Sequence, residues 1–264
     1  MQEAEDFREE SRALHALLAP LDPDSYTAPT QFKGWSVNDV LQHLHVWNEM
    51  AGLQLTDEAE LERRFGRLIE LAGDLRAYEA EALDGLSGAD LLAAWIEGVE
   101  RLADLYQSAD PKQRLKWVGP SMSARSSITA RLMETWAHGQ EIYDEVGVVR
   151  ENADRIRGIV VLGVNTYRWT YAARGAEPPG AMPQLILTAP SGEVWMFGED
   201  SENGVVEGLA EEFCQVVTQT RNVADTQLNV TGDVARDWMS KAQCFAGAAA
   251  EPPAPGQRFT KTAD

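Results

Sequence analysis

Apolar residues recur every three or four positions through most of the first half of the chain, which is the spacing of amphipathic helices. Ser36 is followed three residues later by Asp39, a variant of the capping box that marks a helix N-terminus. The short connections between the helices favour an antiparallel four-helix bundle. The predicted helices cover residues 2–19, 36–47, 57–73, 87–105 and about 124–146.

The pattern changes after about residue 150. Two alternating segments joined by a Pro-Ser-Gly turn are typical of a β-hairpin. The predicted elements of this half are a helix over 153–174, the hairpin strands 184–188 and 193–197, a helix over 205–220, a strand over 226–231 and a helix over 233–246.

These elements predict a two-domain chain. An all-α helix bundle is expected at residues 1–150, and a smaller α+β domain at 151–247. The last segment, 248–264, is rich in alanine and proline near its start, so we expect a mobile tail there.

The balance of charges excludes several classes of partner. The 264 residues include 42 Asp and Glu against 23 Lys and Arg, a formal net charge of −19. Such an acidic chain repels nucleic-acid phosphates and anionic membranes, so neither is expected as a partner. The expected partner is a small-molecule substrate, and a homodimer is compatible with this composition.

The N-terminus and the cysteines indicate the compartment. No run of 18 apolar residues predicts a transmembrane helix, and the acidic start MQEAEDFREE lacks the features of a signal peptide. Two cysteines, Cys214 and Cys244, do not make a disulfide framework. Together these features favour a cytoplasmic protein.

One pair of residues on the helix over 124–146 suggests metal chemistry. Glu134 and His138 are four residues apart, so they share a helix face and can hold one divalent ion. His43 or His45 could supply a third ligand, and three protein ligands would leave an open position. However, Glu134 and His138 lie opposite the apolar stripe of their helix. On the residues alone a solvated surface pair is therefore the simpler interpretation.

Two segments resemble the mycothiol-dependent maleylpyruvate isomerase family, which belongs to the DinB-like group of metal-binding helix bundles. The run 34–44 has a tryptophan, Trp35, eight residues before His43, and the run 131–142 has an aromatic residue between Glu134 and His138. The resemblance implies that His43, rather than His45, joins Glu134 and His138 in coordinating Zn²⁺, with water at the fourth position. Ni²⁺ or Fe²⁺ would also suit this ligand set.

The second half is similar to the sterol-carrier-like α+β domain of the same group. In the isomerase that domain supplies an arginine to the active site. Here the last predicted helix has Lys241 near that place, and lysine cannot reproduce bidentate binding of a carboxylate. The chain therefore resembles a bacterial subgroup of the family other than the isomerase itself.

The resemblance implies an enzyme that activates a small-molecule thiol, or water, at the metal. A thiolate that adds to an activated alkene, allows bond rotation and leaves again gives isomerisation, and addition alone gives thiol transfer. The alternatives are hydrolysis by zinc-bound water and a non-catalytic protein that binds a metal and a small apolar ligand.

Several other polar and aromatic side chains are candidates for supporting roles. Hydrogen bonding near the metal is the candidate role for Asn38, Gln42, Gln140 and Lys241, helix packing or substrate stacking for Trp35 and Trp136, and binding of a substrate carboxylate for Arg125 and Arg131.

Overall fold

The computed structural model describes residues 1–117, 121–199 and 202–262. The chain divides into two compact units, Met1–Glu145 and Val146–Asp264, with the division five residues before the predicted domain boundary. In the described residues, no helix combines the length and apolar character needed to span a membrane.

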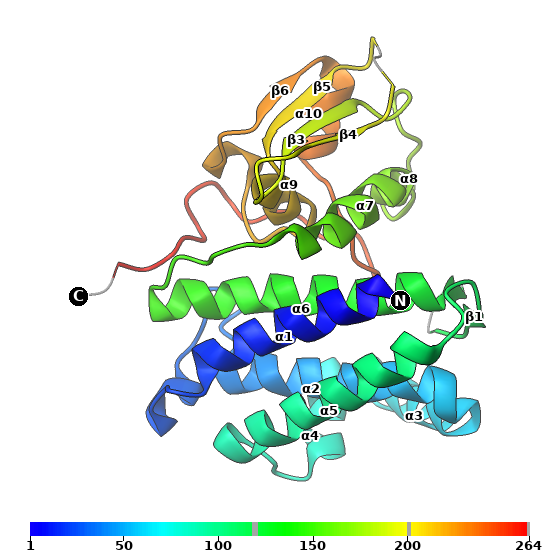
Figure 1. Cartoon of the computed structure of the whole chain (residues 1–264), viewed down its shortest axis with the longest axis vertical. Coiled ribbons are helices and arrows are strands. Elements are labelled where there is room, and N and C mark those ends of the chain that lie inside the picture. The colour runs from blue at the N-terminus through cyan, green and yellow to red at the C-terminus, as the bar shows by residue number, and fades with distance from the viewer. Residues whose placement is uncertain (118–120, 200–201, 263–264) are drawn as a thin grey trace. The chain divides into compact units, whose positions relative to one another are not determined.

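The first unit is helical, and its four longest helices are α1, α2, α5 and α6 (Figure 1). Helix α5 packs against both α1 and α2. Large apolar side chains such as Phe7, Trp95 and Trp136 are fully buried between the helices. The elements are α1 (Gln2–Leu18), η1 (Pro23–Thr27), α2 (Val37–Thr56), α3 (Glu58–Glu70), α4 (Leu75–Leu83), α5 (Gly88–Ser108), a short antiparallel pair of β1 (Arg114–Leu115) and β2 (Met122–Ser123), and α6 (Ala124–Val146).

Helix α2 begins at the capping box that the sequence predicts. The Ser36 hydroxyl accepts from the backbone N–H of Asp39 at 3.1 Å, and the Asp39 carboxylate accepts from the Ser36 N–H at 2.9 Å. Both bonds satisfy backbone donors that the helix itself cannot pair. The box therefore fixes where α2 starts, and with it the rotational position of the residues that follow.

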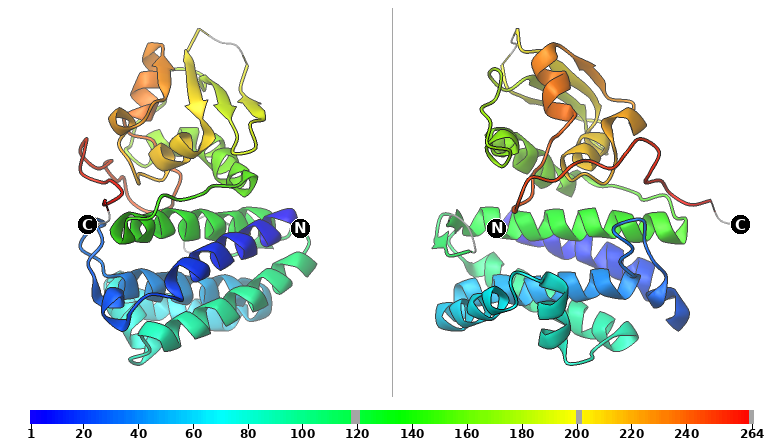
Figure 2. Two further views of the ribbon diagram at one scale, coloured as in Figure 1. Left: turned by 60° about the vertical axis from the view of Figure 1, so that its left-hand side comes forward. Right: turned by 180° about the vertical axis from the view of Figure 1, so that it is seen from behind.

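The second unit contains a small mixed sheet with strand order β4-β3-β5-β6. Strand β3 pairs antiparallel with β4 and parallel with β5, and β5 pairs antiparallel with β6. Helix α9 packs against β3 and β5, and α10 against β6 (Figure 2). The elements are η2 (Asp154–Ile156), α7 (Arg157–Asn165), α8 (Tyr167–Ala172), β3 (Gln184–Thr188), β4 (Val194–Phe197), β5 (Val205–Leu209), α9 (Ala210–Val217), η3 (Val223–Asp225), β6 (Asn229–Thr231) and α10 (Asp233–Met239).

Two predicted helices of this unit are partly wrong. The segment 205–220 begins with a strand, because β5 gains backbone hydrogen bonds on both sides as an inner strand of the sheet. The last helix ends at Met239 rather than at residue 246. Beyond it the chain turns to α9, where the Cys244 N–H donates to the carbonyl of Val217 at 2.9 Å.

The segment 248–264, for which the composition predicts a mobile tail, makes several hydrogen bonds in its described part. Ala250 donates its N–H to the side chain of Gln243 at 2.9 Å, and the carbonyl of Pro253 accepts from Asn222 at 2.8 Å. Arg258 donates to the carbonyl of Gln219 at 3.0 Å. These bonds hold the tail against the second unit, and a reading of composition alone cannot detect such partners.

Replacing Ser36 with alanine should test the capping box. The substitution removes the side-chain acceptor at the N-cap of α2, which we expect to lower the free energy of unfolding by about 1 kcal/mol. Ser87 is the matched control, because it is the N-cap of α5 but makes no side-chain capping bond. Urea denaturation of Ser36→Ala and Ser87→Ala measures both effects, and equal losses would contradict the capping role of Ser36.

Candidate metal centre

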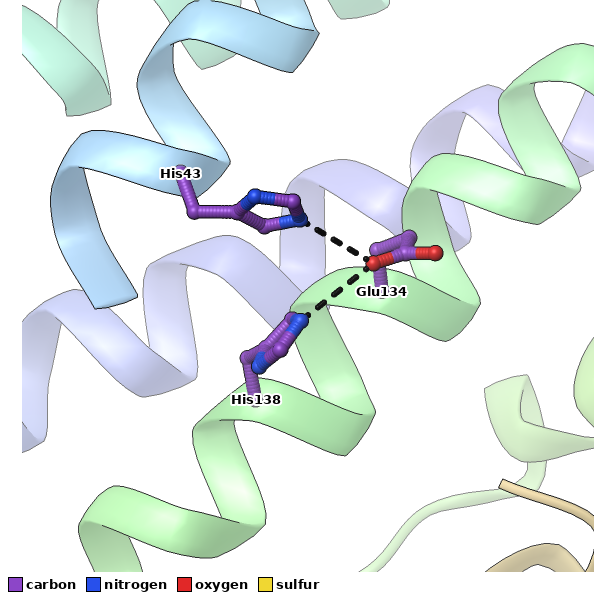
Figure 3. A group of neighbouring side chains, drawn as sticks. All are labelled: His43, Glu134 and His138. Carbon is purple, nitrogen blue, oxygen red and sulfur yellow. Dashed lines mark hydrogen bonds and ion pairs between the residues drawn. The ribbon is translucent and has the colours of Figure 1, made fainter. Parts of the chain in front are cut away.

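Helices α2 and α6 bring three potential metal ligands to one place. His43 lies on α2, and Glu134 and His138 lie one turn apart on α6 (Figure 3). The Nε2 atom of each histidine is 3.4 Å from the same oxygen, Oε2 of Glu134. One ligand atom from each of the three residues lies within 4.8 Å of the others. Two imidazole nitrogens and one carboxylate oxygen form a donor set that suits Zn²⁺ and leaves a fourth position open.

A second carboxylate engages the far nitrogen of each histidine. Nδ1 of His43 is 2.7 Å from Oε1 of Glu79, and Nδ1 of His138 is 3.3 Å from Oε2 of Glu141. Metal-binding histidines usually donate their other ring N–H to a carboxylate or carbonyl, which orients the ring and increases its basicity. Both rings of this cluster therefore have the outer partner that a metal site requires.

Glu79 is held by three donors from two helices. The Trp47 indole N–H of α2 donates to its Oε1 at 3.0 Å, and Arg76 of α4 donates to its Oε2 at 2.5 Å. Burial alone would raise the pKa of Glu79, but hydrogen bonds from His43 and Trp47 and the charge of Arg76 lower it. An ionised carboxylate only accepts, so Nδ1 of His43 carries the proton. The other ring nitrogen, Nε2, faces Glu134 at 3.4 Å.

In the absence of a metal, the pKa values of Glu134 and His138 are shifted in opposite directions. Burial opposes the charge of Glu134, yet the hydrogen bonds and charges of His138 and His43 hold its pKa well below the usual range. Burial likewise opposes a charged His138, but Glu141 and Glu134 outweigh it and raise the pKa of His138 to about 10. Without a metal, the ring of His138 therefore holds an extra proton. A metal ion must displace this proton in order to bind the ring.

Aromatic rings pack beside the two histidines. The ring of Trp35 stacks on His138 with 5.8 Å between centroids and an interplanar angle of 8°, and it lies 5.5 Å from the ring of His43. Phe32 meets His138 edge-on at 5.2 Å. Arg76 lies over the ring of Trp35, 5.0 Å from its centroid. Trp136, in contrast, is fully buried in the helical core.

The structure separates His45 from the cluster. Nε2 of His45 is 3.6 Å from Glu49, one turn further along α2, and its ring lies near Gly98 of α5. Desolvation lowers the pKa of His45, although the charge of Glu49 partly offsets this. Residues 43 and 45 differ by about 200° around a helix, so one of them faces α6 and the other faces α5.

The remaining candidates make contacts that do not include the three clustered residues. The Gly88 N–H donates to Asn38, Gln42 accepts from Arg76, Gln140 donates to Asp144, and Arg125 pairs with Glu3. Arg131 is buried, and its Nε donates to Asn48 at 2.9 Å. Lys241 belongs to the second unit, where it pairs with Asp237 at 2.8 Å.

Comparison with known proteins shows to which protein family the chain is related. Residues 7–143, about half of the sequence, match the family model described as the mycothiol maleylpyruvate isomerase N-terminal domain. The chain belongs to this family. Two Mycobacterium tuberculosis sequences from different strains, both named only as uncharacterized proteins, are 38% identical over 248 residues, covering 92% of this family member and 94% of each relative.

Two solved structures share the fold of this chain, although their sequences have low identity to it. The crystal structure of the mycothiol-dependent maleylpyruvate isomerase matches with a TM-score of 0.56 at 14% identity, over 96% of this chain and 95% of that one. A mutant of that isomerase, in which a histidine is replaced by alanine, matches with a TM-score of 0.53 at 15% identity. This match covers 81% of this chain and 87% of the mutant chain. At this identity the likeness establishes the fold alone.

Sequence reasoning missed the two outer carboxylates of this family member. Glu141 lies three residues after His138, so helical spacing alone could have found it. Glu79 lies 36 residues from His43, on the short helix α4, which the sequence pattern did not reveal. Only the packing of α4 against α2 brings this carboxylate to the histidine.

The raised pKa of His138 should make the stability of the metal-free protein depend on pH. The ordinary pKa of 6.5 applies to the unfolded chain, against about 10 in the folded one. The charged ring therefore stabilises the fold fully below about pH 6.5, and this contribution is lost as the pH rises toward about 10. We expect the free energy of unfolding of chelator-treated protein, measured in urea, to fall across this range.

The control for this pH profile is a second histidine substitution. His138→Gln should flatten the fall, whereas His15→Gln, outside the cluster, should keep it. Identical pH profiles for wild type and His138→Gln would contradict the assignment.

Proposed function

We propose that this chain is an enzyme that binds a divalent metal ion through His43, Glu134 and His138. Zn²⁺ is the primary candidate for this ion. The observation that carries the proposal is the pair of outer carboxylates, Glu79 and Glu141, one on the Nδ1 of each histidine. A solvated Glu/His pair needs no such partners. Two oriented rings aimed at one carboxylate oxygen are what a metal site needs.

The proposed reaction is a thiol-dependent isomerisation or thiol transfer on a small molecule. The supporting finding is the family, whose solved relative is named as a mycothiol-dependent maleylpyruvate isomerase. A bound Zn²⁺ would supply stabilisation of a thiolate at neutral pH. In isomerisation the thiolate forms an S–C bond to an activated alkene, and the same bond breaks after rotation. No oxidant or reductant is consumed, and the buried cysteines of the chain take no part.

The residues around the cluster would each do a separate task in this reaction. Glu79 and Glu141 keep the Nδ1 protons of the two histidines in place, so that both Nε2 atoms remain acceptors of a metal. Trp35, packed on His138, restricts water on that side of the cluster. Arg76 pairs with both Glu79 and Asp39 beside the site, which reduces the cost of burying the Glu79 carboxylate.

We further assign the two units to the folds that the resemblance implies. The first unit, with its ligands on neighbouring helices, fits a DinB-like bundle, and the second, with a mixed sheet and helices, fits a sterol-carrier-like domain. Lys241 in the second unit is paired with Asp237, which makes it a weak replacement for an arginine that binds a carboxylate.

Metal content is the first test of the proposal. Plasma mass spectrometry of untagged protein should find about one zinc per chain, since the ligand set supports one ion. His43→Ala and the double variant Glu134→Ala/His138→Ala should lose it, and His45→Ala, two residues from His43, should keep it. Circular dichroism checks that each variant is folded. A wild type without metal after reconstitution, or loss in His45→Ala alone, would contradict the assignment.

Thiol dependence is the second test, and it separates the proposed reaction from its alternatives. Zinc-loaded protein is assayed spectrophotometrically with cis-unsaturated carboxylates, maleylpyruvate among them, with and without mycothiol. We expect turnover only with the thiol, and its loss in Glu134→Ala/His138→Ala but not in His15→Ala. Thiol-independent hydrolysis would favour zinc-bound water as the nucleophile. A metal-loaded protein without any turnover would favour the non-catalytic binding protein.

A further inference from the structure

The residues just before α2 form a tight turn beside the metal centre. Trp35 donates its backbone N–H to the carbonyl of Phe32 at 2.9 Å, and the φ angles of the two central residues, Lys33 and Gly34, are 53° and 70°. Two positive φ angles are typical of a type I′ turn, which connects the strands of the tightest hairpins. The N–H of Thr30 donates to the carbonyl of Trp35 at 2.7 Å and closes the hairpin. Phe32 and Trp35 are therefore held at the two ends of one turn.

Lys33 adopts a strained conformation in this turn. A side chain with a Cβ meets steric strain at positive φ, which is why glycine, asparagine and aspartate are preferred there. The side chain of Lys33 returns over Phe32, with Nζ 4.9 Å from the ring centroid. The hairpin continues to Val37, whose N–H donates to the carbonyl of Ala28 at 3.2 Å, and the next residue after Trp35 is Ser36, the N-cap of α2. Strain of this kind persists where the surrounding contacts fix the backbone, and it occurs often at functional sites.

Both ends of the turn contact His138 of α6. Trp35 covers a face of the imidazole, with 5.8 Å between the ring centroids and 8° between the ring planes, and Phe32 meets it edge-on at 5.2 Å. Phe32 and Trp35 also contact each other, with 5.2 Å between centroids and 79° between planes. Stacked and edge-on contacts are the favoured arrangements of aromatic rings. A stacked ring opposes tilting of the imidazole plane, and an edge-on ring opposes its lateral movement.

The two histidines of the cluster differ in how firmly hydrogen bonds orient them. Nδ1 of His43 is 2.7 Å from Glu79, a buried carboxylate that also accepts from Trp47. Nδ1 of His138 is 3.3 Å from Glu141, which is longer than a typical N–H···O hydrogen bond. A longer contact restrains direction less. The orientation of His138 therefore depends more on the rings packed against it than the orientation of His43 does.

We propose that the turn 32–35 is a positioning element that orients His138 for the metal ion. Since the ligand role of His138 is part of the proposed function, this role of the turn rests on it. A ring that is already oriented loses less freedom when it binds, so the turn increases the affinity for the metal. The turn also leads directly into α2, and Trp35 lies 5.5 Å from the ring of His43 as well. One short segment thus sets the relation between the two imidazoles, whose centroids are 4.8 Å apart.

The zinc affinity of the full chain, measured by competition with a chromophoric chelator, tests this role. In Gly34→Ala the added Cβ meets no atom within 4 Å, so the substitution acts through backbone strain at a φ of 70°. Partners that orient metal ligands contribute about 10–100-fold to metal affinity, so we expect zinc binding to weaken by about tenfold or more.

Gly192→Ala is the matched control for this variant. Gly192 also has a positive φ, 88°, and open space at its Cβ position, but it lies in the turn between β3 and β4 of the second unit. The same kind of backbone strain there should leave the zinc affinity at the wild-type value. Equal zinc affinities in Gly34→Ala and Gly192→Ala overturn the proposal.

Two substitutions of Trp35 separate ring stacking from a general loss of structure. Trp35→Phe keeps an aromatic ring against His138 and should stay within about threefold of the wild-type zinc affinity. Trp35→Leu removes the stacked ring and should weaken zinc binding by about tenfold or more. Circular dichroism checks that both variants are folded. Wild-type affinity in Trp35→Leu, or equal weakening in Trp35→Phe and Trp35→Leu, overturns the proposal.

A measurement on the metal-free protein separates this inference from the proposed metal site. In nuclear magnetic resonance spectra of chelator-treated protein, the ring protons of His138 should be shifted upfield, because they lie over the face of the Trp35 indole. His138→Gln identifies these signals, and Trp35→Leu should remove the shift. Unshifted His138 signals in the wild type overturn the proposal. Shifted signals in a wild type that binds no zinc support the orienting role of the turn and overturn the proposed metal site instead.

Discussion

The contact between the Glu79 carboxylate and Nδ1 of His43 is the interaction on which the candidate centre depends. It joins α4 to α2, sets the tautomer of the ring and aims Nε2 at Glu134 on α6. A buried carboxylate is costly, and this one is stabilised because Trp47, Arg76 and His43 all donate to it. The geometry of three helices is thus coupled to the protonation of one imidazole.

Polar contacts recur along the line where α2 and α6 meet. His43 faces Glu134, Asn48 accepts from Arg131, and Ser127 donates to Gln54 at 2.5 Å. The residue numbers rise on one helix as they fall on the other, so the two helices are antiparallel. A hydrophobic seam would tolerate small rotations of either helix, whereas directional polar contacts at three levels restrict them.

These three levels differ in how completely their polar atoms are satisfied. At the level of Gln54, Tyr106 and Ser127 complete a buried hydrogen-bond network. At the level of His43, each ring nitrogen of the two histidines faces a carboxylate. His43, Glu134 and His138 could together hold a metal ion. Between them, Asn48 Nδ2 and Arg131 Nη2 find no acceptor within the described residues. Unpaired buried donors are uncommon in folded proteins, and they distinguish this middle level from an ordinary structural network.

The second unit shows how tertiary pairing overrides local pattern. The apolar spacing from Val205 onward is compatible with a helix, but the segment becomes β5 because β3 and β6 offer partners on both sides. The tail also has partners that are distant in the sequence. Composition predicts that this segment is mobile, whereas the side chains of Gln219 and Gln243 form hydrogen bonds with its backbone. Neither set of partners is visible within a short sequence window.

The sequence by itself determined the helical first half, the start of α2 at Ser36 and the shared face of Glu134 and His138. These features depend on local spacing and on hydrogen bonds between residues three or four positions apart, which any helix imposes. The choice between His43 and His45 was beyond periodicity, because both flank the apolar face of α2. Only the tertiary structure placed His43 against α6 and brought Glu79 to it across 36 residues. Such long-range contacts arise from the packing of whole helices, and no local pattern specifies them.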